Sequence, residues 1–166
     1  MIRLTGLPEE RFPAYRARLT REYARDKVAA GVWSPEEAPR RAEADLEGTL
    51  PDGVNTRDHF LYEVRDASTS EEVGVLWLAI RNQDSGRLVW IYDLEIFERF
   101  RRKGYAKRTL EAAEEEAKEL GIGRVELHVF GHNAPARALY ENAGYAPTSI
   151  VMAKQLGGGR GLEVPQ

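Results

Sequence analysis

The sequence predicts a mixed α/β (α+β) domain, and three observations along the chain lead to this prediction. Apolar residues in the first third recur at three- and four-residue steps, which is typical of helices that cover a core. The middle third switches to runs rich in aromatic and β-branched residues, which favour strands. The last third alternates helical and strand-like segments, and 166 residues are enough for one domain with a sizeable core.

Two helices are predicted in the first third. The first has an apolar stripe made of Phe12, Tyr15, Leu19 and Tyr23. Gly31 is expected to end this helix. The second is expected over about residues 40–50, because Pro39 removes one backbone hydrogen bond from any helix that begins earlier.

Three strands are predicted in the middle of the chain. They cover residues 59–64, 73–81 and 88–97, with a polar hairpin loop between the first two. The third strand is mostly apolar on both faces, which indicates a position at the centre of a sheet. Asp93 and Glu95 are its acidic exceptions, and because they alternate with Leu94 they are expected to face the same side.

The last third predicts a helix, a strand, a short helix and a final strand. These cover about residues 106–120, 124–130, 133–144 and 149–156. Gly121 is expected to end the long helix, and Asn133 to cap the short one. Residues 1–156 are therefore expected to form a single domain, followed by a flexible glycine-rich tail at 157–166.

Composition and charge exclude several classes of function. The net charge of −3 argues against a broad nucleic-acid-binding surface, which would be basic. The chain has no Cys, so disulfides, thiolate metal sites and cysteine nucleophiles are excluded, and its three His residues are too scattered for a metal site. No apolar run approaches the roughly 18 residues of a membrane span, and no secretory signal is visible. A cytoplasmic protein that binds neither nucleic acid nor membrane is expected.

A basic loop between the third strand and the long helix carries the clearest chemical signal. It consists of Arg101, Arg102, Lys103, Gly104, Tyr105, Ala106 and Lys107. A helix N-terminus has unpaired backbone N–H groups and a partial positive charge, and Gly104 lets a ligand approach the backbone closely. The pattern indicates a diphosphate-binding loop, with a tight turn bearing solvated cations as the alternative.

The loop resembles the acyl-CoA signature of the GCN5-related N-acetyltransferase (GNAT) superfamily. That signature is Gln or Arg, two residues of any type, Gly, one of any type, and Gly or Ala, and the segment from Arg101 to Ala106 fits it. A second segment, from Asn133 to Tyr145, is similar to the family's downstream pattern N-x-x-A-x-x-L-Y-x-x-x-G followed by Phe or Tyr. The resemblance covers an acyl-CoA-binding core of about residues 60–153.

The resemblance implies a three-layer sandwich in which a splayed, mostly antiparallel sheet has helices on both faces. It implies acetyl-CoA as cosubstrate and no metal. The pantetheine arm would pair with the strand backbone at Leu94 and Ile96, and the pyrophosphate would take N–H groups from about Arg101 to Lys107. Asn133 would approach the CoA arm as well as cap its helix.

The resemblance also implies catalytic roles. Tyr140 matches a tyrosine that lies near the CoA sulfur in many relatives, and it would donate a proton or hydrogen bond to the leaving thiolate. The position of the base varies in the family. From the residues themselves, Glu95 is the favoured general base because it lies nearer the loop, with Asp93 as the weaker candidate. The alternative is a carboxylate paired with an Arg or Lys on a neighbouring strand. Because an amine has a pKa near 10 and a carboxylate one near 4, burial must raise the carboxylate pKa or a water must relay the proton. Without a Cys or a serine elbow, direct attack in a ternary complex is expected.

The predicted function is therefore transfer of an acetyl group from acetyl-CoA to a primary amine. The alternative is a non-catalytic acyl-CoA-binding module, and a transferase that uses ATP is disfavoured because no P-loop occurs. The acceptor stays open between a polyamine, an aminoglycoside and a lysine or N-terminal amine of a peptide. Relatives are often dimers, so a homodimer is one open possibility.

Overall fold

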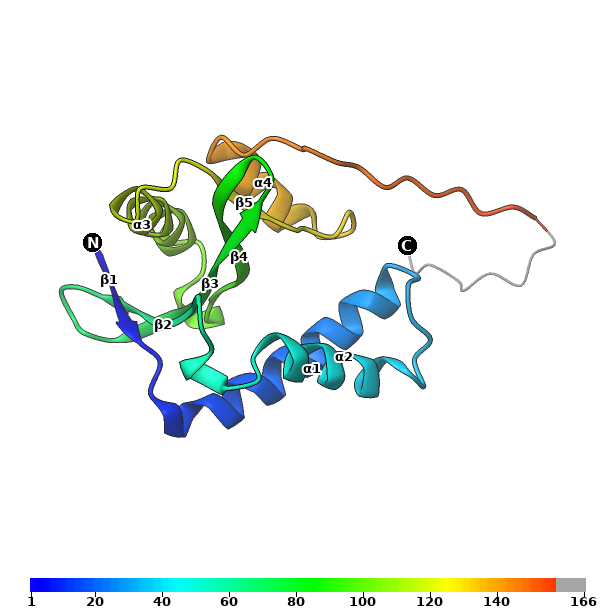
Figure 1. The fold of residues 1–166 in the computed structure, drawn as a ribbon, viewed down its shortest axis with the longest axis horizontal. Helices are drawn as coiled ribbons and strands as arrows, with labels where there is room; N and C mark the ends of the chain where they lie inside the picture. Colours follow the sequence, from blue (N-terminus) through cyan, green and yellow to red (C-terminus); the bar gives the residue numbers. More distant parts are fainter. Residues whose placement is uncertain (158–166) are drawn as a thin grey trace. The chain divides into compact units, whose positions relative to one another are not determined.

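The computed structural model of the chain describes residues 1–157, and contacts divide them into two compact units (Figure 1). The first unit comprises residues 1–13 and 50–128. The second comprises residues 14–49 and the described residues from 129 onward. Apart from Gly157, the predicted tail lies outside the described residues. The single domain and the tail therefore stay predictions.

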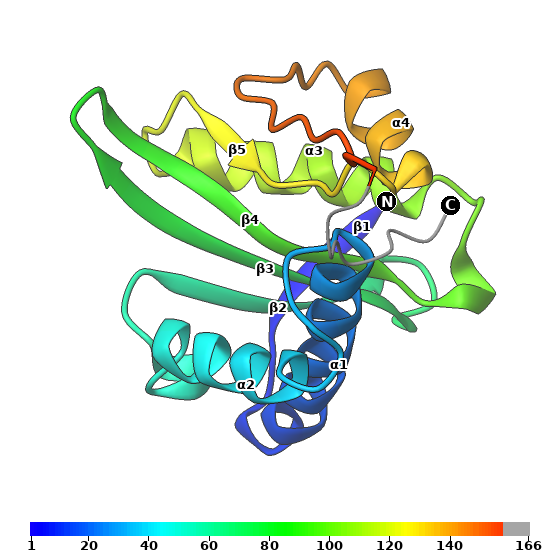
Figure 2. The same cartoon turned by 90° about the vertical axis from the view of Figure 1, so that its right-hand side faces the viewer.

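A five-stranded sheet forms the centre of the first unit (Figure 2). In spatial order its strands are β1 (Ile2–Gly6), β2 (His59–Asp66), β3 (Glu72–Gln83), β4 (Gly86–Ile96) and β5 (Val125–Leu127). Neighbouring strands are antiparallel except β4 and β5, which are parallel. The predicted mixed α/β class with a mostly antiparallel sheet is confirmed.

Helix α3 (Tyr105–Glu119) packs on one face of this sheet, against β1, β3 and β4. Its residues Leu110, Ala113 and Ala117 are at most 1% exposed, and their spacing of three and four residues forms the apolar stripe of the helix predicted at about 106–120. Residues 73–79 of β3 are buried without a break. The core of the first unit therefore lies between α3 and the middle of the sheet.

Helices α1 (Phe12–Ala29) and α2 (Ala38–Thr49) pack together in the second unit, which also contains α4 (Ala134–Asn142). Their buried cluster consists of Ala24, Trp33, Ala38 and Ala42. Pro39 is the second residue of α2, where its missing N–H is not needed, so the helix begins earlier than predicted. Short 3₁₀ helices lie at Glu9–Arg11 (η1), Gly53–Asn55 (η2) and Glu98–Phe100 (η3). No helix among residues 1–157 is long and apolar enough to cross a membrane.

Three predictions of strands need correction. The strand β1 was not predicted, although Ile2 and Leu4 alternate with polar residues, because the segment is short and precedes a helical pattern. The strand predicted at 124–130 is paired only at Val125–Leu127, since β4 bends away beyond that point. Residues 149–156 form no strand, and Val151 is 96% exposed. A β-prone segment forms a strand only where a neighbouring edge accepts it, and three residues of β5 offer little edge.

Candidate active site

A bulge in β4 marks the centre of the site. Trp77 of β3 pairs with Asp93, but the next residue, Leu78, pairs with Ile91, so Tyr92 is an extra residue in β4. A bulge bends its strand and increases the local twist. Since β5 pairs only with the three residues that end at Ile91, the two parallel strands separate at the bulge. The sheet is splayed at this point.

Beyond the bulge, β4 presents an open backbone edge. The Phe97 N–H donates to the Val73 carbonyl of β3 at 2.9 Å. Because successive residues of an antiparallel strand direct their backbone groups to opposite sides, the N–H and C=O groups of Leu94 and Ile96 point away from β3. On that side, the Ile96 carbonyl accepts a hydrogen bond from Arg101 Nε at 2.9 Å. This hydrogen bond joins the edge to the basic loop, which follows it after η3.

Basic side chains of the loop and of the first turn of α3 stabilise the conformation of the loop. Arg102 and Gly104 both have positive φ angles, of 62° and 78°, which turn the chain sharply into α3. Arg108 Nη2 donates to the Lys103 carbonyl at 2.9 Å, and its guanidinium lies 4.7 Å from the Tyr105 ring centroid. Residues 101–104 are exposed. Two arginines thus shape the loop while its remaining cations face solvent.

The N-terminus of α3 has the donors that a diphosphate requires. Gly104 is its N-cap in the left-handed conformation, with no side-chain cap, so the first helical N–H groups lack acceptors within the helix. A Cβ at Gly104 would lie 3.3 Å from Arg108 Nη1 and would narrow the approach. Arg108 Nε is a buried donor with no hydrogen-bond partner among residues 1–157. Uncapped N–H groups and a close approach at the glycine together fit a diphosphate group.

Tyr105 connects the start of α3 to the β2–β3 turn through a hydrogen bond. Its hydroxyl donates to Asp66 Oδ2 at 2.6 Å. Asp66 Oδ1 accepts from the backbone N–H groups of Ser68 at 2.8 Å and Thr69 at 3.1 Å. The hydrogen bonds from Ser68, and then from Tyr105, hold the pKa of the Asp66 carboxyl well below its usual range. We call the Tyr105–Asp66 pair the loop anchor.

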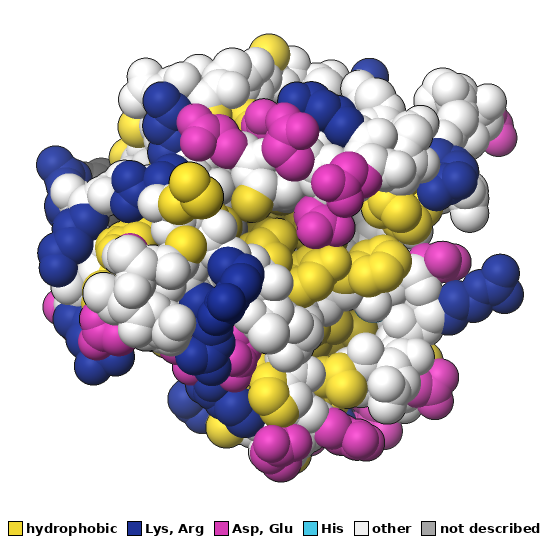
Figure 3. All heavy atoms as spheres, turned by 90° about the vertical axis from the view of Figure 1, so that its left-hand side faces the viewer, with side chains coloured by type: hydrophobic (Ala, Val, Ile, Leu, Met, Phe, Trp, Pro, Cys, Tyr) yellow, Lys and Arg dark blue, Asp and Glu magenta, His cyan; other side chains and the backbone are white. Residues whose placement is uncertain are grey.

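A small crevice identifies the sheet face that α3 covers. It has a volume of about 50 Å³, and Phe60 and Leu78 of the sheet line it together with Glu116 and Leu120 at the end of α3. Hydrophobic side chains reach the surface beside acidic ones in Figure 3. Burial, and then the Glu116 carboxylate, raise the pKa of Tyr62 at this crevice to about 12. The crevice is too small for a cosubstrate. Its lining shows which side chains of the sheet lie on the face that α3 covers, and therefore which lie on the opposite face.

Asp93 and Glu95 lie on the other face of the sheet. Asp93 pairs with Trp77 and Glu95 pairs with Val75, and these β3 residues alternate with Leu78, which faces α3. The two carboxylates therefore share one face, near the point where β4 leaves β5. No group of three or more His, Asp or Glu side chains among residues 1–157 is arranged to hold a metal ion.

An aromatic platform on the same face was not predicted from the sequence. The rings of Trp77 and Tyr92 stack with centroids 4.2 Å apart, and Trp90 meets Tyr92 edge-on at 6.3 Å. The Arg81 guanidinium carbon lies 3.9 Å from the Trp90 ring centroid, and its Nη2 donates to the Tyr92 hydroxyl at 2.7 Å. Trp77 Nε1 donates to His59 Nδ1 at 3.0 Å. We call these five residues the platform.

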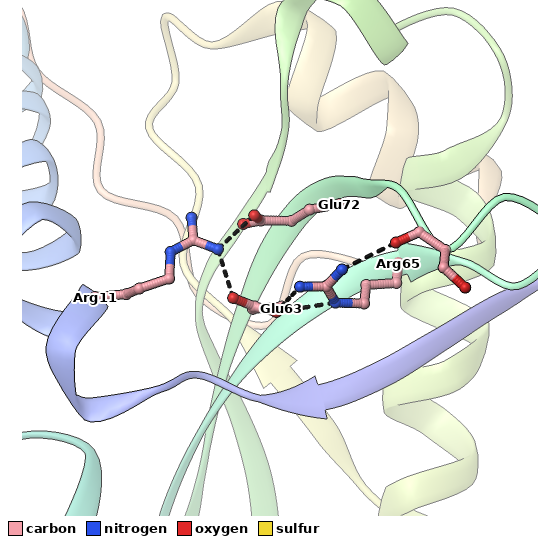
Figure 4. Close-up of polar contacts among 5 residues, drawn as sticks. Arg11, Glu63, Arg65 and Glu72 are labelled. Carbon is pink, nitrogen blue, oxygen red and sulfur yellow. Dashed lines mark hydrogen bonds and ion pairs between the residues drawn. The ribbon is translucent and has the colours of Figure 1, made fainter.

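A network of charges occupies another part of this face (Figure 4). The Glu63 side chain is only 3% exposed, and it accepts hydrogen bonds from Arg11 and Arg65. Arg11 also bonds Glu72, and this bond contributes most to raising the pKa of Arg11. Each charge in the network has an opposite partner. Glu63 is therefore a structural carboxylate and not a candidate base.

Asn133, the N-cap of α4, and Tyr140, within α4, lie in the second unit, whereas the other predicted site residues lie in the first. Asn133 Oδ1 accepts from the Ala136 N–H at 3.2 Å, so its predicted capping role is confirmed. The Tyr140 and Tyr145 ring centroids are 6.0 Å apart. Gly144, with a φ of 91°, turns the chain after α4. The two tyrosines of the motif thus lie close together, and its glycine forms the turn that ends α4.

A comparison with known families assigns the chain. Residues 16–145 match the family model described as acetyltransferase (GNAT) family. The chain belongs to this family. The matched residues include the open β4 edge, the basic loop and α4, so the resemblance inferred from the loop and the Asn133 motif is confirmed.

Relatives of this GNAT chain match it along nearly their whole length. The uncharacterized N-acetyltransferase YycN of Bacillus subtilis (strain 168) is 38% identical over 155 residues, which are 93% of this chain and 99% of YycN. A crystal structure of YycN, described as a putative acetyltransferase, has a TM-score of 0.88 and covers 94% of this chain and 99% of that one. AAC(6')-Iy, solved with the bisubstrate analog CoA-S-monomethyl-acetylneamine, shares the fold at 16% identity and a TM-score of 0.61, covering 94% of this chain and 98% of its own. The chain is an acetyltransferase of the GNAT fold.

Proposed function

We propose that this acetyltransferase transfers an acetyl group from acetyl-CoA to a primary amine, by direct attack while both substrates are bound. One observation carries the proposal. The open β4 edge at Leu94 and Ile96 is followed, after the short η3 helix, by the basic loop and the N-terminus of α3, and Arg101 of the loop bonds back to Ile96. Along the chain, backbone groups that can pair with amides come first, and N–H groups that can bind a diphosphate follow. CoA carries its amides and its diphosphate in the same order.

The donor is bound by backbone groups and by cations. The N–H and C=O groups of Leu94 and the N–H of Ile96 pair with the amides of the pantetheine arm, as in an added strand, while the Ile96 carbonyl stays bonded to Arg101. The diphosphate receives N–H groups and positive charge from Arg101, Arg102, Lys103, Gly104, Tyr105, Ala106 and Lys107. Asn133 adds a contact to the CoA arm in the proposal. When bound, acetyl-CoA supplies an acyl group that is activated as a thioester.

Glu95 prepares the amine in this proposal. Only the free base attacks, and the large difference between amine and carboxylate pKa values requires either a raised carboxylate pKa or a water that relays the proton. Glu95 immediately precedes Ile96 and shares its face with Asp93, which is the second candidate. Glu63 is not a candidate because two arginines already neutralise it.

Tyr140 assists the sulfur as the thiolate leaves. A thiol has a pKa near 8.5 and a phenol one near 10, so a hydrogen bond or proton from Tyr140 gives modest help. The support for this role is the match of α4 to the family motif. Because the chain contains no Cys, the acyl group does not pass through a cysteine of the enzyme.

Two measurements on the purified chain test the proposal. Release of free thiol from acetyl-CoA is followed with a panel of primary amines, and CoA binding is measured by titration calorimetry. We expect saturable CoA binding and thiol release that depends on the amine. Tight CoA binding without turnover on a broad panel would indicate the non-catalytic acyl-CoA-binding module instead. Failure to bind CoA at all would contradict both.

A further inference from the structure

We propose that Arg81 binds an anionic group, a carboxylate or a phosphate, on the amine acceptor. This inference rests on the proposed function and names the chemical class of its acceptor. It is carried by the position of Arg81 on the platform, by the contacts of its guanidinium with Trp90 and Tyr92, and by the donors that these contacts leave unused.

The platform lies next to the position that the acceptor amine must reach in order to attack the thioester. Tyr92 is the bulged residue at which β4 leaves β5, and next to it in sequence is Asp93, on the same face as Glu95. The open edge proposed for the pantetheine arm begins at Leu94, two residues further on. Arg81 therefore lies beside the end of the arm that carries the thioester.

The Arg81 guanidinium is held in place. It lies over the Trp90 ring at 3.9 Å, is 4.8 Å from the Tyr92 ring centroid and donates to the Tyr92 hydroxyl. Tyr92 is in turn stacked on Trp77, whose indole N–H is bonded to His59. An arginine that is already ordered loses little further entropy when it binds an anion, which favours affinity.

The charge of Arg81 has no opposite partner among residues 1–157. Its one hydrogen bond goes to a neutral hydroxyl, whereas a guanidinium has five N–H donors in a fork that matches a carboxylate or a phosphate. Arg11 and Arg65, on the same sheet face, are instead neutralised by Glu63 and Glu72. Arg81 is thus the member of this face that can take an external anion.

The remaining charges of the face give the acceptor an orientation. His59 competes little for the anion, since its Nδ1 accepts from Trp77 Nε1 and since burial, and then the nearby Arg81, lower its pKa. Glu95 follows Tyr92 by three residues, or about 10 Å along a strand, and Asp93 lies between them. A cation at one end and carboxylates at the other suit a molecule that carries its amine and its anion at opposite ends. A purely cationic acceptor is disfavoured, because Arg81 already covers the Trp90 ring and would repel a second cation.

The test compares matched acceptors on the intact chain. One pair is a short ω-amino acid and its amide, and the other is an aminoalkyl phosphate and the corresponding amino alcohol. We measure kcat/KM from thiol release for the wild type, Arg81→Gln and Arg81→Lys. Arg87→Gln is the matched control, because it removes a charge from the neighbouring position on β4, which lies on the face that α3 covers.

We expect the wild type to prefer the anionic member of at least one pair by about tenfold or more, as the loss of a charged partner usually costs. Arg81→Gln should abolish this preference by lowering kcat/KM for the anionic member about tenfold or more relative to the neutral member, while the KM for acetyl-CoA changes less than about twofold. Arg81→Lys should restore part of it, which a merely structural role would not predict, and Arg87→Gln should leave it intact. If only one of the two pairs shows the preference, that pair identifies the anion as a carboxylate or as a phosphate.

Two outcomes would overturn the inference. One is a wild type that turns over neutral or cationic amines as well as anionic ones. The other is an Arg81→Gln variant that keeps the preference, or that loses activity equally on both members while retaining its CoA affinity and thermal unfolding midpoint. A wild type that binds CoA but acetylates no amine at all contradicts the proposed function instead, so the two failures are distinguishable.

Discussion

The two proposed substrate sides of the first unit are constructed in different ways. The donor side comprises the β4 edge, the loop and the start of α3, and it lies within one continuous stretch at residues 94–108. The acceptor side comprises the platform with Asp93 and Glu95, and it is assembled from side chains on β2, β3 and β4. Backbone groups dominate the first and side chains dominate the second. A donor site of this kind leaves a motif in the sequence, and an acceptor site of the second kind leaves none.

The largest effect is expected from Gly104→Val, which attacks the backbone of the donor side. A β-branched residue is strained at a φ of 78°, and its Cβ would press on Arg108. We expect CoA affinity to fall by about 100-fold, since the first N–H groups of α3 would be displaced. Titration calorimetry with CoA measures the change.

Gly123→Val is the matched control for this substitution. Gly123 lies outside the loop, and a Cβ there would meet nothing within 4 Å. CoA affinity should therefore stay within about twofold of the wild type. Equal losses in the two variants would mean that the donor side does not depend on its local backbone.

A smaller effect is expected from Tyr140→Phe, which tests whether chemistry requires a residue outside the first unit. Loss of a proton donor to the sulfur should lower kcat by about 30-fold and raise the KM for acetyl-CoA by less than about twofold. Steady-state thiol release with a saturating amine measures both constants. Tyr145→Phe, which keeps the neighbouring ring, is the control, and an unchanged kcat in Tyr140→Phe would remove this residue from the chemistry.

A still smaller effect is expected from breaking the loop anchor. Tyr105→Phe removes the hydrogen bond to Asp66 but keeps the ring, so α3 should start in a less defined position. We expect CoA affinity to fall by about fivefold, as for one charge-assisted hydrogen bond, with kcat unchanged at saturation. Asp66→Asn and the double variant complete a mutant cycle, and additive effects would show that the two residues do not act together.

No effect of pH is expected on the loop anchor. The folded pKa of Asp66 is lowered, so its contribution is present above an unfolded pKa of about 3.9 and is lost only as pH falls further. The bond to Asp66 raises the pKa of Tyr105, so its contribution is present below about pH 10 and is lost only as pH rises beyond that. The ratio of CoA affinities of the wild type and Tyr105→Phe should therefore be constant from about pH 5 to about pH 9. Turnover should rise with pH over the same range as the amine deprotonates.

Much of the fold could be predicted because its signals are local. The α3 stripe, the Asn133 cap and strands β2, β3 and β4 each depend on spacing within about a dozen residues. The donor side stays a prediction that rests on equally local signals, since Gly104 and the cations adjoin a periodic helix. Helix α2 begins two residues before the predicted start, because Pro39 lies in its first turn, where a proline costs no hydrogen bond, and not in the helix interior.

Features that depend on pairing partners could not be predicted. The bulge at Tyr92 is visible only in the register between β3 and β4, and it decides where β5 ends. The platform brings together residues up to 33 positions apart, from His59 to Tyr92, so no spacing rule connects them. Residues 149–156 have the composition of a strand, but composition does not supply a neighbour.

Tyr92 makes β4 one residue longer than the part of β3 with which it pairs. Deleting it would let β4 continue straight beside β5, and the resulting ladder would occupy the backbone groups of Leu94 and Ile96. Such a deletion removes no charge and no motif residue, yet it would leave no edge for a ligand to join. Among proteins of this fold, we therefore expect an insertion or deletion at the bulge to lower acetyltransferase activity more than most substitutions in the basic loop do.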